Sequence, residues 1–227
     1  MNKARKLKVL AIPDLHMPWH MDLSPIYKII KKLKPDVIIQ LGDLYDLFSY
    51  SKFARSLDVL TPEEEMFQGV KAATMMWKQI CKLSPRSRKI QLRGNHDIRI
   101  MKRAIERAPE LSHILDKHQG DLWRFKGVET VMCDKTGVVI EDVLYVHGWL
   151  TTLGQHMRSL GVSVVHGHSH RSGMIQNTLL GKQLFELDCG YWADPNVVPL
   201  KYGVGPHMNW IHCIGWVDVY GPRIITL

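Results

Sequence analysis

The stretch that decides the fold is Asp36-Val-Ile-Ile-Gln-Leu-Gly-Asp-Leu-Tyr-Asp46. Its first half is a short, mostly apolar run, which predicts a strand that is buried on both faces. At the end of this run Gly42 lets the backbone bend, and two carboxylates, Asp43 and Asp46, follow it. Carboxylates at the end of a buried strand are costly unless a cation offsets their charge. Asp43 could also simply cap a helix, so a cation site is indicated only if similar residues follow other strands.

The same arrangement, an apolar run followed by polar side chains that can bind a metal, recurs four more times. The further motifs are Asp14-Leu-His16, Gly94-Asn95-His96-Asp97, His147-Gly148 and Gly167-His168-Ser-His170. Residues two apart in an extended segment point the same way, so Asp14 and His16 can bind one ion, and His168 and His170 form a similar pair. Carboxylate, amide and imidazole groups together suit Mn²⁺, Fe or Zn²⁺ better than Ca²⁺ or Mg²⁺ alone.

The order of the predicted elements indicates an α/β fold. Strands at residues 9–12, 36–41 and 89–92 alternate with two helices, one capped by Ser24 and ended by Pro35, the other capped by Thr61. A basic helix over 98–107 and a second short helix before Gly120 are expected next. Later runs predict antiparallel strands at 128–133, 138–140 and 143–146, a strand at 162–165, a hairpin over 177–188, and closing strands at 210–220 and 223–226. This order predicts a mixed α/β sandwich with all the ligand-bearing turns at one end of the strands.

The composition is that of an ordinary globular protein. The 227 residues fit one domain over 1–227, with 45% hydrophobic and 23% charged residues. No apolar run reaches membrane-spanning length and no signal-peptide core follows the N-terminus, so we expect a cytoplasmic protein that does not bind a membrane. The four cysteines lack CxxC spacing and are expected to be reduced. The net charge of +8 favours a polyanionic partner.

Taken together, the five motifs resemble the complete motif series of the calcineurin-like metallophosphoesterases, over residues 14–170. The resemblance implies a two-sheet mixed β-sandwich flanked by helices, in a four-layer αββα arrangement. It also implies two divalent transition-metal ions, with Mn²⁺ expected and Fe or Zn²⁺ as alternatives. One ion would be held by Asp14, His16, Asp43 and His170, and Asp43 would bridge to a second ion held by Asn95, His147 and His168.

The resemblance further implies hydrolysis of a phosphoester. Two cations roughly 3.5–4 Å apart can share a hydroxide, lower its pKa, and bind the phosphoryl oxygens for in-line attack. His96 has no metal bond in this scheme, so it is free to neutralise the transition state and to protonate the leaving oxygen. Asp46 would orient His96, as the family's Asp-His pair does.

Three functions compete for this site. The first is a phosphodiesterase or nuclease that acts on nucleic acid ends, single strands or oligonucleotides, as the basic charge favours. The second is a phosphomonoesterase for a phosphoprotein or nucleotide; Arg93-Gly-Asn-His is similar to the phosphoprotein phosphatases, but Leu47 and Asp97 depart from their Arg and Glu. The third, a scaffold without catalysis, is disfavoured because every ligand position is filled.

Several residues near these motifs are candidates for contacts with a substrate. A basic cluster flanks the third motif, and aromatic rings near the ligand turns could stack a base, although packing is the alternative role for them. The candidate substrate contacts are Arg93, Arg99, Trp149 and Trp192. His166 lies on the other register of its strand and is expected to be a core or supporting histidine. The oligomeric state stays open.

Overall fold

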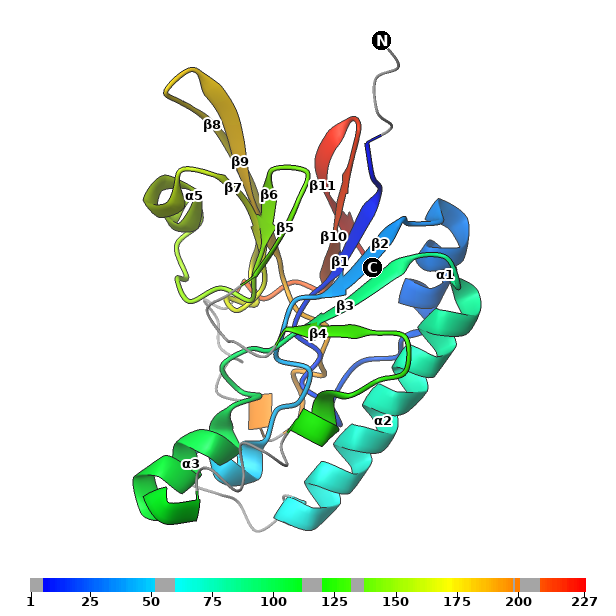
Figure 1. The fold of residues 1–227 in the computed structure, drawn as a ribbon, viewed down its shortest axis with the longest axis vertical. Helices are drawn as coiled ribbons and strands as arrows, with labels where there is room; N and C mark the ends of the chain where they lie inside the picture. The colour runs from blue at the N-terminus through cyan, green and yellow to red at the C-terminus, as the bar shows by residue number, and fades with distance from the viewer. Residues whose placement is uncertain (1–5, 52–59, 112–119, 132–136, 198, 201–208) are drawn as a thin grey trace.

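Two β-sheets lie face to face, and helices cover their outer faces (Figure 1). The computed structural model describes residues 6–51, 60–111, 120–131, 137–197, 199–200 and 209–227. The first sheet has the order β11-β10-β1-β2-β3-β4. Its strands are β1 (Val9–Ile12), β2 (Val37–Gln40), β3 (Arg88–Leu92), β4 (Glu129–Val131), β10 (Cys213–Asp218) and β11 (Gly221–Thr226). The second sheet has the order β5-β6-β7-β9-β8, built from β5 (Val138–Ile140), β6 (Val143–Tyr145), β7 (Ser163–His166), β8 (Ser172–Leu179) and β9 (Lys182–Cys189).

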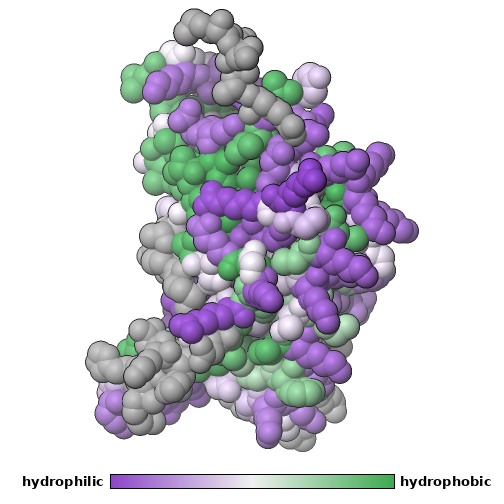
Figure 2. All heavy atoms as spheres, turned by 45° about the vertical axis from the view of Figure 1, so that its right-hand side comes forward, coloured by the Kyte–Doolittle hydropathy of each residue, from purple (hydrophilic) through white to green (hydrophobic). Residues whose placement is uncertain are grey.

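Helices complete the outer layers on both sides of the sandwich. The α-helices are α1 (Ser24–Leu33), α2 (Pro62–Leu83), α3 (Arg99–Arg107) and α5 (Gln155–Leu160), and the short 3₁₀ turns are η1 (Phe48–Tyr50), η2 (Pro109–Leu111) and η3 (Gly120–Trp123). Helices α1 and α2 lie against the first sheet, and α5 lies beside the second (Figure 1). The face over α1 and α2 is largely hydrophilic (Figure 2). None of the helices among the described residues is long and apolar enough to cross a bilayer. The predicted αββα architecture of the α/β class is confirmed.

Strand β2 shows why the deciding stretch is apolar. Its residues point alternately to the two faces of the sheet, and both faces are covered. Ile38 packs into the cluster between the first sheet and the helices, together with Ile26 and Trp77. Val37 and Ile39 pack into the cluster between the two sheets. A strand in this position has no face that water reaches, so a continuous apolar run fits it.

The helix starts agree with the sequence in one case and differ in the other. Thr61 caps α2 as predicted: its side chain accepts a hydrogen bond from the backbone of Glu64, whose carboxylate accepts one from the backbone of Thr61. The prediction that Ser24 caps α1 is wrong. Ser24 is already the first helical residue, and the Asp22 carboxylate accepts hydrogen bonds from its backbone N–H and its hydroxyl.

The later strands are less antiparallel than the sequence predicts. Strands β5 and β6 pair antiparallel, but β4 pairs parallel to β3 and β6 pairs parallel to β7. A long crossover that contains a helix connects each of these parallel pairs, and such a connection brings the chain back in the same direction. The hairpin β8–β9 and the closing pair β10–β11 are antiparallel, as predicted. The prediction of a second short helix before Gly120 falls on a stretch that includes residues 112–119, which are outside the described residues.

Two glutamines make a buried polar link beneath the strand ends. Gln40 and Gln91 are neighbours in the register of β2 and β3, and the Gln91 amide donates a hydrogen bond to the Gln40 carbonyl oxygen. Gln40 accepts from the Gly42 backbone N–H and donates to the Gly42 carbonyl, so its side chain closes the turn that follows β2. The Gln91 carbonyl oxygen accepts the indole N–H of Trp77 on α2 at 3.1 Å.

We expect Gln91→Leu to lower the free energy of unfolding by about 1–3 kcal/mol, because the buried N–H of Trp77 loses its acceptor. Urea denaturation followed by circular dichroism measures this change. Gln176→Leu, the same substitution at an exposed position of β8, is the matched control and should change stability much less. Equal stabilities of the two variants would contradict a structural role for the glutamine link.

Candidate metal centre

The five motifs meet at one end of the sandwich, each in the turn after its strand. These turns reverse sharply, and four of the candidate ligands adopt the left-handed backbone region although they carry side chains. They are His16 (φ 48°), Asp43 (φ 48°), His168 (φ 69°) and His170 (φ 59°). This conformation costs roughly 1–2 kcal/mol per residue. Strain of this kind concentrates where a site requires a particular side-chain direction.

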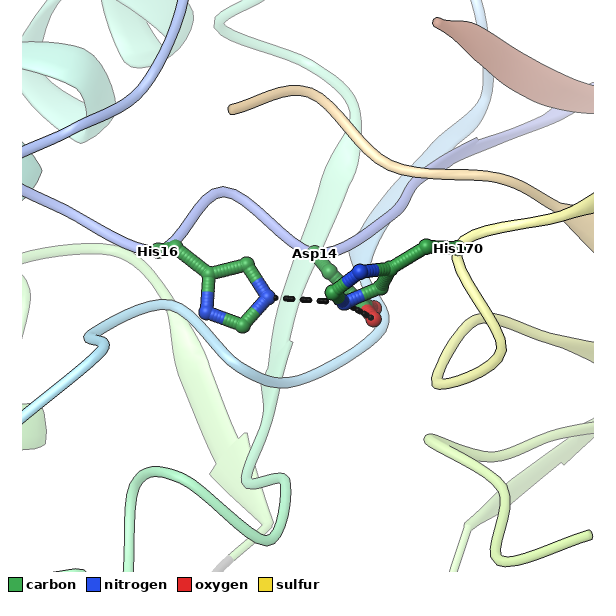
Figure 3. Close-up of side chains that lie close together, drawn as sticks. All are labelled: Asp14, His16 and His170. Carbon is green, nitrogen blue, oxygen red and sulfur yellow. Dashed lines mark hydrogen bonds and ion pairs between the residues drawn. The ribbon is translucent and has the colours of Figure 1, made fainter. Parts of the chain in front are cut away.

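The first group of ligands surrounds Asp14. Asp14, His16 and His170 point toward one another (Figure 3). The Nε2 atoms of His16 and His170 lie 2.9 Å apart, and His170 Nε2 lies 3.3 Å from Asp14 Oδ2. The same carboxylate oxygen accepts the backbone N–H of His168 at 2.9 Å. Three ligand atoms from two turns, those after β1 and β7, therefore converge on one buried point.

The second group surrounds Asp43 and Asn95. His147 Nε2 lies 3.4 Å from Asp43 Oδ2 and 2.9 Å from Asn95 Oδ1. Asn95 Oδ1 also lies 2.9 Å from His168 Nδ1. The other ring nitrogen of His147 lies 3.7 Å from Asp14 Oδ1, so this histidine connects the two groups. All seven candidate ligands thus lie in one continuous cluster.

The cluster fits divalent transition metals. Asp14 is 0% exposed and Asp43 is 1% exposed, so both carboxylates lie away from the water that would normally solvate their charge. Several buried atoms that could bind a metal have no hydrogen-bond partner among the described residues. They include Asp14 Oδ1, His147 Nδ1 and His170 Nδ1. Three-residue sets within the cluster also have metal-ligand spacing, with their donor atoms within 4.8 Å of one another; they are Asp14–His16–His170 and Asp14–Asp43–His147. Oxygen and imidazole donors in this combination suit Mn²⁺, Fe or Zn²⁺.

Two glycines allow the backbone to approach these carboxylates. A Cβ atom at Gly94 would lie 2.2 Å from Asp43 Oδ1, and one at Gly167 would lie 2.2 Å from Asp14 Oδ1. No side chain fits at either distance. The glycines of the third and fifth motifs are therefore required by the close packing of the turns against the two aspartates.

The charges of the cluster shift the pKa values of its histidines. Burial alone would lower the pKa of His147, but the Asp43 and Asp14 carboxylates outweigh it and raise that pKa to about 9. Burial and the neighbouring His147 lower the pKa of His168 to about 4. Without a bound cation, a protonated His147 offsets part of the carboxylate charge. A metal must displace this proton in order to bind the ring.

Asp46 and His96 lie beside the cluster, together with Arg99. Asp46 Oδ2 is 2.9 Å from His16 Nδ1 and 3.4 Å from His96 Nδ1. Arg99 Nη1 donates to Asp46 Oδ1 at 2.7 Å and to the Asp46 carbonyl at 2.8 Å, while Nη2 contacts His96 Nε2 at 3.1 Å. The guanidinium can only donate, so His96 accepts at Nε2. Asp46 therefore contacts a candidate metal ligand as well as His96, which the sequence did not indicate.

Asp97 is a further residue of this region whose contribution the sequence did not predict. Its carboxylate accepts the backbone N–H groups of Tyr45 at 2.9 Å and Gly94 at 2.7 Å. It thereby joins the turn after β2 to the turn after β3. The only available signal was its position directly after Gly94-Asn95-His96, which does not indicate what the side chain binds.

The four candidate substrate contacts differ in accessibility. Trp149 is 36% exposed. Arg99 lies at the site, and Arg93 has a buried Nε without a hydrogen-bond partner among the described residues. Trp192 is only 4% exposed, and its indole N–H donates to the Asp22 carbonyl. Its ring is part of the core next to α1 and α2, so the prediction that Trp192 stacks a base is wrong.

The comparisons with known proteins agree with this geometry. The family model described as calcineurin-like phosphoesterase matches residues 7–220. The chain belongs to the calcineurin-like phosphoesterase family. Two relatives, both called Gene 54 protein, come from the Mycobacterium phages D29 and L5; they are 24% identical over 246 residues and 25% identical over 245 residues. Each alignment covers 96% of this chain and 91% of the relative. Membership of this phosphoesterase family indicates a hydrolase of phosphoesters that binds two divalent metals.

We expect Asp43→Asn to abolish most of the stabilisation that added Mn²⁺ gives. A metal at 100 times its dissociation constant stabilises the native state by about 2.7 kcal/mol. Asparagine keeps the shape, tolerates the positive φ and can still accept the backbone N–H of His96, but it removes the charge that both ions would share. Thermal unfolding with and without Mn²⁺, together with metal analysis of the purified protein, measures the effect.

Asp142→Asn is the matched control, because Asp142 is exposed and also has a positive φ of 65°. It should retain the full response to Mn²⁺. If Asp43→Asn responds like Asp142→Asn, the assignment of Asp43 as a shared ligand is wrong.

Proposed function

We propose that this protein is a metal-dependent phosphodiesterase or nuclease that acts on nucleic acid ends, single strands or oligonucleotides. The observation that supports this most is the juxtaposition of the buried ligand cluster with His96, Asp46 and Arg99. Asp14, His16, Asp43 and His170 would hold one ion, and Asp43, Asn95, His147 and His168 the other. When bound, such ions polarise phosphoryl oxygens and lower the pKa of water to near neutrality.

Three side chains of the chain itself supply the remaining chemistry. His96 lies next to Asp43, with its Nε2 3.8 Å from Asp43 Oδ2, and so would lie close to a phosphoryl group bound by ions at the cluster. Asp46 Oδ2 lies 3.4 Å from the other ring nitrogen of His96 and would thereby orient the ring. The Arg99 guanidinium, which is partly exposed, can bind a phosphoryl oxygen and offset its negative charge. Once Arg99 has turned from His96 to the substrate, His96 Nε2 would take up a proton from solvent. The ring, then protonated on both nitrogens, would donate this proton to the leaving oxygen.

Support for a nucleic acid substrate comes from charge and from exposed side chains near the site. Helix α3, which begins at Arg99, has no buried residue, and its basic side chains Lys102, Arg103 and Arg107 follow Arg99 along the helix. A row of cations of this kind can follow a phosphate backbone away from the reacting group. Trp149 offers an exposed ring for stacking on a base.

A phosphomonoesterase is the second candidate, and Arg99 is the observation that favours it. A terminal phosphate carries one more negative charge than a diester, and a guanidinium next to the metal ligands would bind that additional charge. A phosphoprotein or a nucleotide would supply such a group.

A panel of substrates separates these functions. We expect the protein with Mn²⁺ to hydrolyse bis(p-nitrophenyl) phosphate and single-stranded DNA faster than p-nitrophenyl phosphate, and to bind DNA with an affinity that falls as salt rises. Hydrolysis of the monoester alone, without salt-dependent DNA binding, would favour the phosphomonoesterase. No hydrolysis by a protein that is loaded with metal would favour a scaffold.

We expect His96→Ala to keep both metals but to lose turnover by about 10²–10⁴-fold on esters with an alkoxide leaving group. The loss should be smaller on nitrophenyl esters, whose leaving group needs no proton. Steady-state kinetics on both ester types and metal analysis of the same preparations measure the difference. Loss of metal in this variant, or an equal loss of rate on both ester types, would contradict the assigned role.

A further inference from the structure

A second buried cluster of ionisable residues lies behind the turn that carries His147. It consists of His156 on α5, His166 at the end of β7 and Glu186 on β9. All three side chains are buried, and none of them belongs to the cluster of seven candidate ligands described above. A glutamate and two histidines are costly to bury in the core unless their polar atoms have partners. The partners of these three side chains therefore indicate what the cluster does.

The partners of His156 fix which of its nitrogens carries the proton. His156 Nε2 accepts the backbone N–H of Trp149 at 3.2 Å and that of Leu150 at 3.3 Å. A nitrogen that faces two N–H donors must present its lone pair, so the proton of the neutral ring lies on Nδ1. His156 Nδ1 is 3.5 Å from Glu186 Oε1, the nearest carboxylate oxygen for that proton.

The same protonation pattern excludes the cluster as a third metal centre, although its spacing would allow one. A metal on His156 Nδ1 would leave the remaining proton on Nε2, directed at the N–H groups of Trp149 and Leu150. Glu186 is also occupied, since its two oxygens accept the backbone N–H groups of Gly154 at 2.8 Å and Met157 at 2.7 Å.

The cluster connects the two turns that carry His147 and His168. His166 Nε2 lies 3.2 Å from Glu186 Oε1, and His166 Nδ1 donates to the Gly167 carbonyl, 2.8 Å away and next to His168. Hydrogen bonds therefore link Gly167, His166 and Glu186, and an ion-pair contact of 3.5 Å continues from Glu186 to His156. His156 in turn accepts from the backbone of Trp149 and Leu150. The exposed ring of Trp149 packs edge-to-face on His156, with centroids 4.9 Å apart.

We propose that His156 and Glu186 are positioning residues that hold the turn 147–150, and through it both the His147 ligand and the Trp149 ring. This rests on the proposed function for what the placed groups do, while the placement itself is independent of the reaction. The essential feature is the lone pair of His156 Nε2, because it is the acceptor for the two N–H groups of the turn. Glu186 keeps that lone pair available because its negative charge, 3.5 Å from His156 Nδ1, favours the proton on that side of the ring.

The direct test compares His156→Met, which fills the space without an acceptor, with His156→Gln, whose side-chain oxygen can replace Nε2. We expect His156→Met to weaken Mn²⁺ binding by about 10–100-fold, as the loss of hydrogen-bonded support behind a metal ligand typically does. It should also raise KM more than it lowers kcat, because Trp149 is displaced from the substrate. His156→Gln should recover most of both properties. Titration calorimetry with Mn²⁺ alone measures the first effect.

A second measurement needs neither metal nor substrate. Amide hydrogen exchange of Trp149 and Leu150, followed by NMR in the metal-free protein, should be faster in His156→Met and near the original rate in His156→Gln. His20→Met, which alters a histidine outside both clusters, is the control and should leave these amides unchanged. This measurement keeps its meaning even if the protein hydrolyses none of the phosphoesters offered.

Two results would overturn the positioning role. One is unchanged exchange of the Trp149 and Leu150 amides in His156→Met. The other is an equal loss of Mn²⁺ affinity in His156→Met and His156→Gln that is proportional to the loss of unfolding free energy in each variant. That result would show that His156 has only a general packing role. Glu186→Gln provides an independent check, because it preserves the shape of the side chain and should weaken Mn²⁺ binding in the same direction as His156→Met.

Discussion

The structure depends on two carboxylates that are buried next to each other. Asp14 and Asp43 are almost completely removed from water; burial disfavours the ionised form of both, and the Asp43 charge adds to this effect at Asp14. Neighbouring histidines outweigh this effect and keep the pKa of both aspartates below the usual value, so both stay charged and need compensation. The turns around them are shaped to supply it: imidazole rings approach the carboxylate oxygens, and backbone N–H groups donate to them. A pair of divalent cations would complete the compensation that the protein groups provide only in part.

Several buried hydrogen-bonded links hold these turns to one another and to the regular elements around them. Gln40 and Gln91 lie beneath the turn after β2, Asp97 joins that turn to the next one, and Glu186 connects β9 to the start of α5. Their polar groups are costly to bury alone but are satisfied by the backbone of the turns they support. Rigid strands and such links together can hold ligands in left-handed backbone conformations that an unsupported turn would leave.

The sequence predicted the parts of this arrangement that follow from local pattern. Apolar runs located the strands, and the residues directly after them located the candidate ligands, because every motif follows the end of a strand. The direction of β4 and β6 could not be predicted in this way, since it is set by long crossovers rather than by the runs themselves. Trp192 was misassigned because an aromatic residue in a loop near ligands can as well fill the core. His156 and Glu186 carry no motif, and only the fold brings them to the turn behind His147.

Asp46 shows why roles at this site cannot be divided among single residues. Its carboxylate contacts His16, which is a candidate metal ligand, His96, which is not, and Arg99. The position of His16 and the orientation of His96 are therefore coupled through the Asp46 side chain. Under the proposed function, a phosphoryl group that attracts Arg99 removes one of the partners of Asp46 and of His96 at the same moment. Binding of substrate would then free His96 Nε2 to carry a proton while Asp46 keeps its contact with His16, so the metal ligand stays in place as the leaving group is protonated.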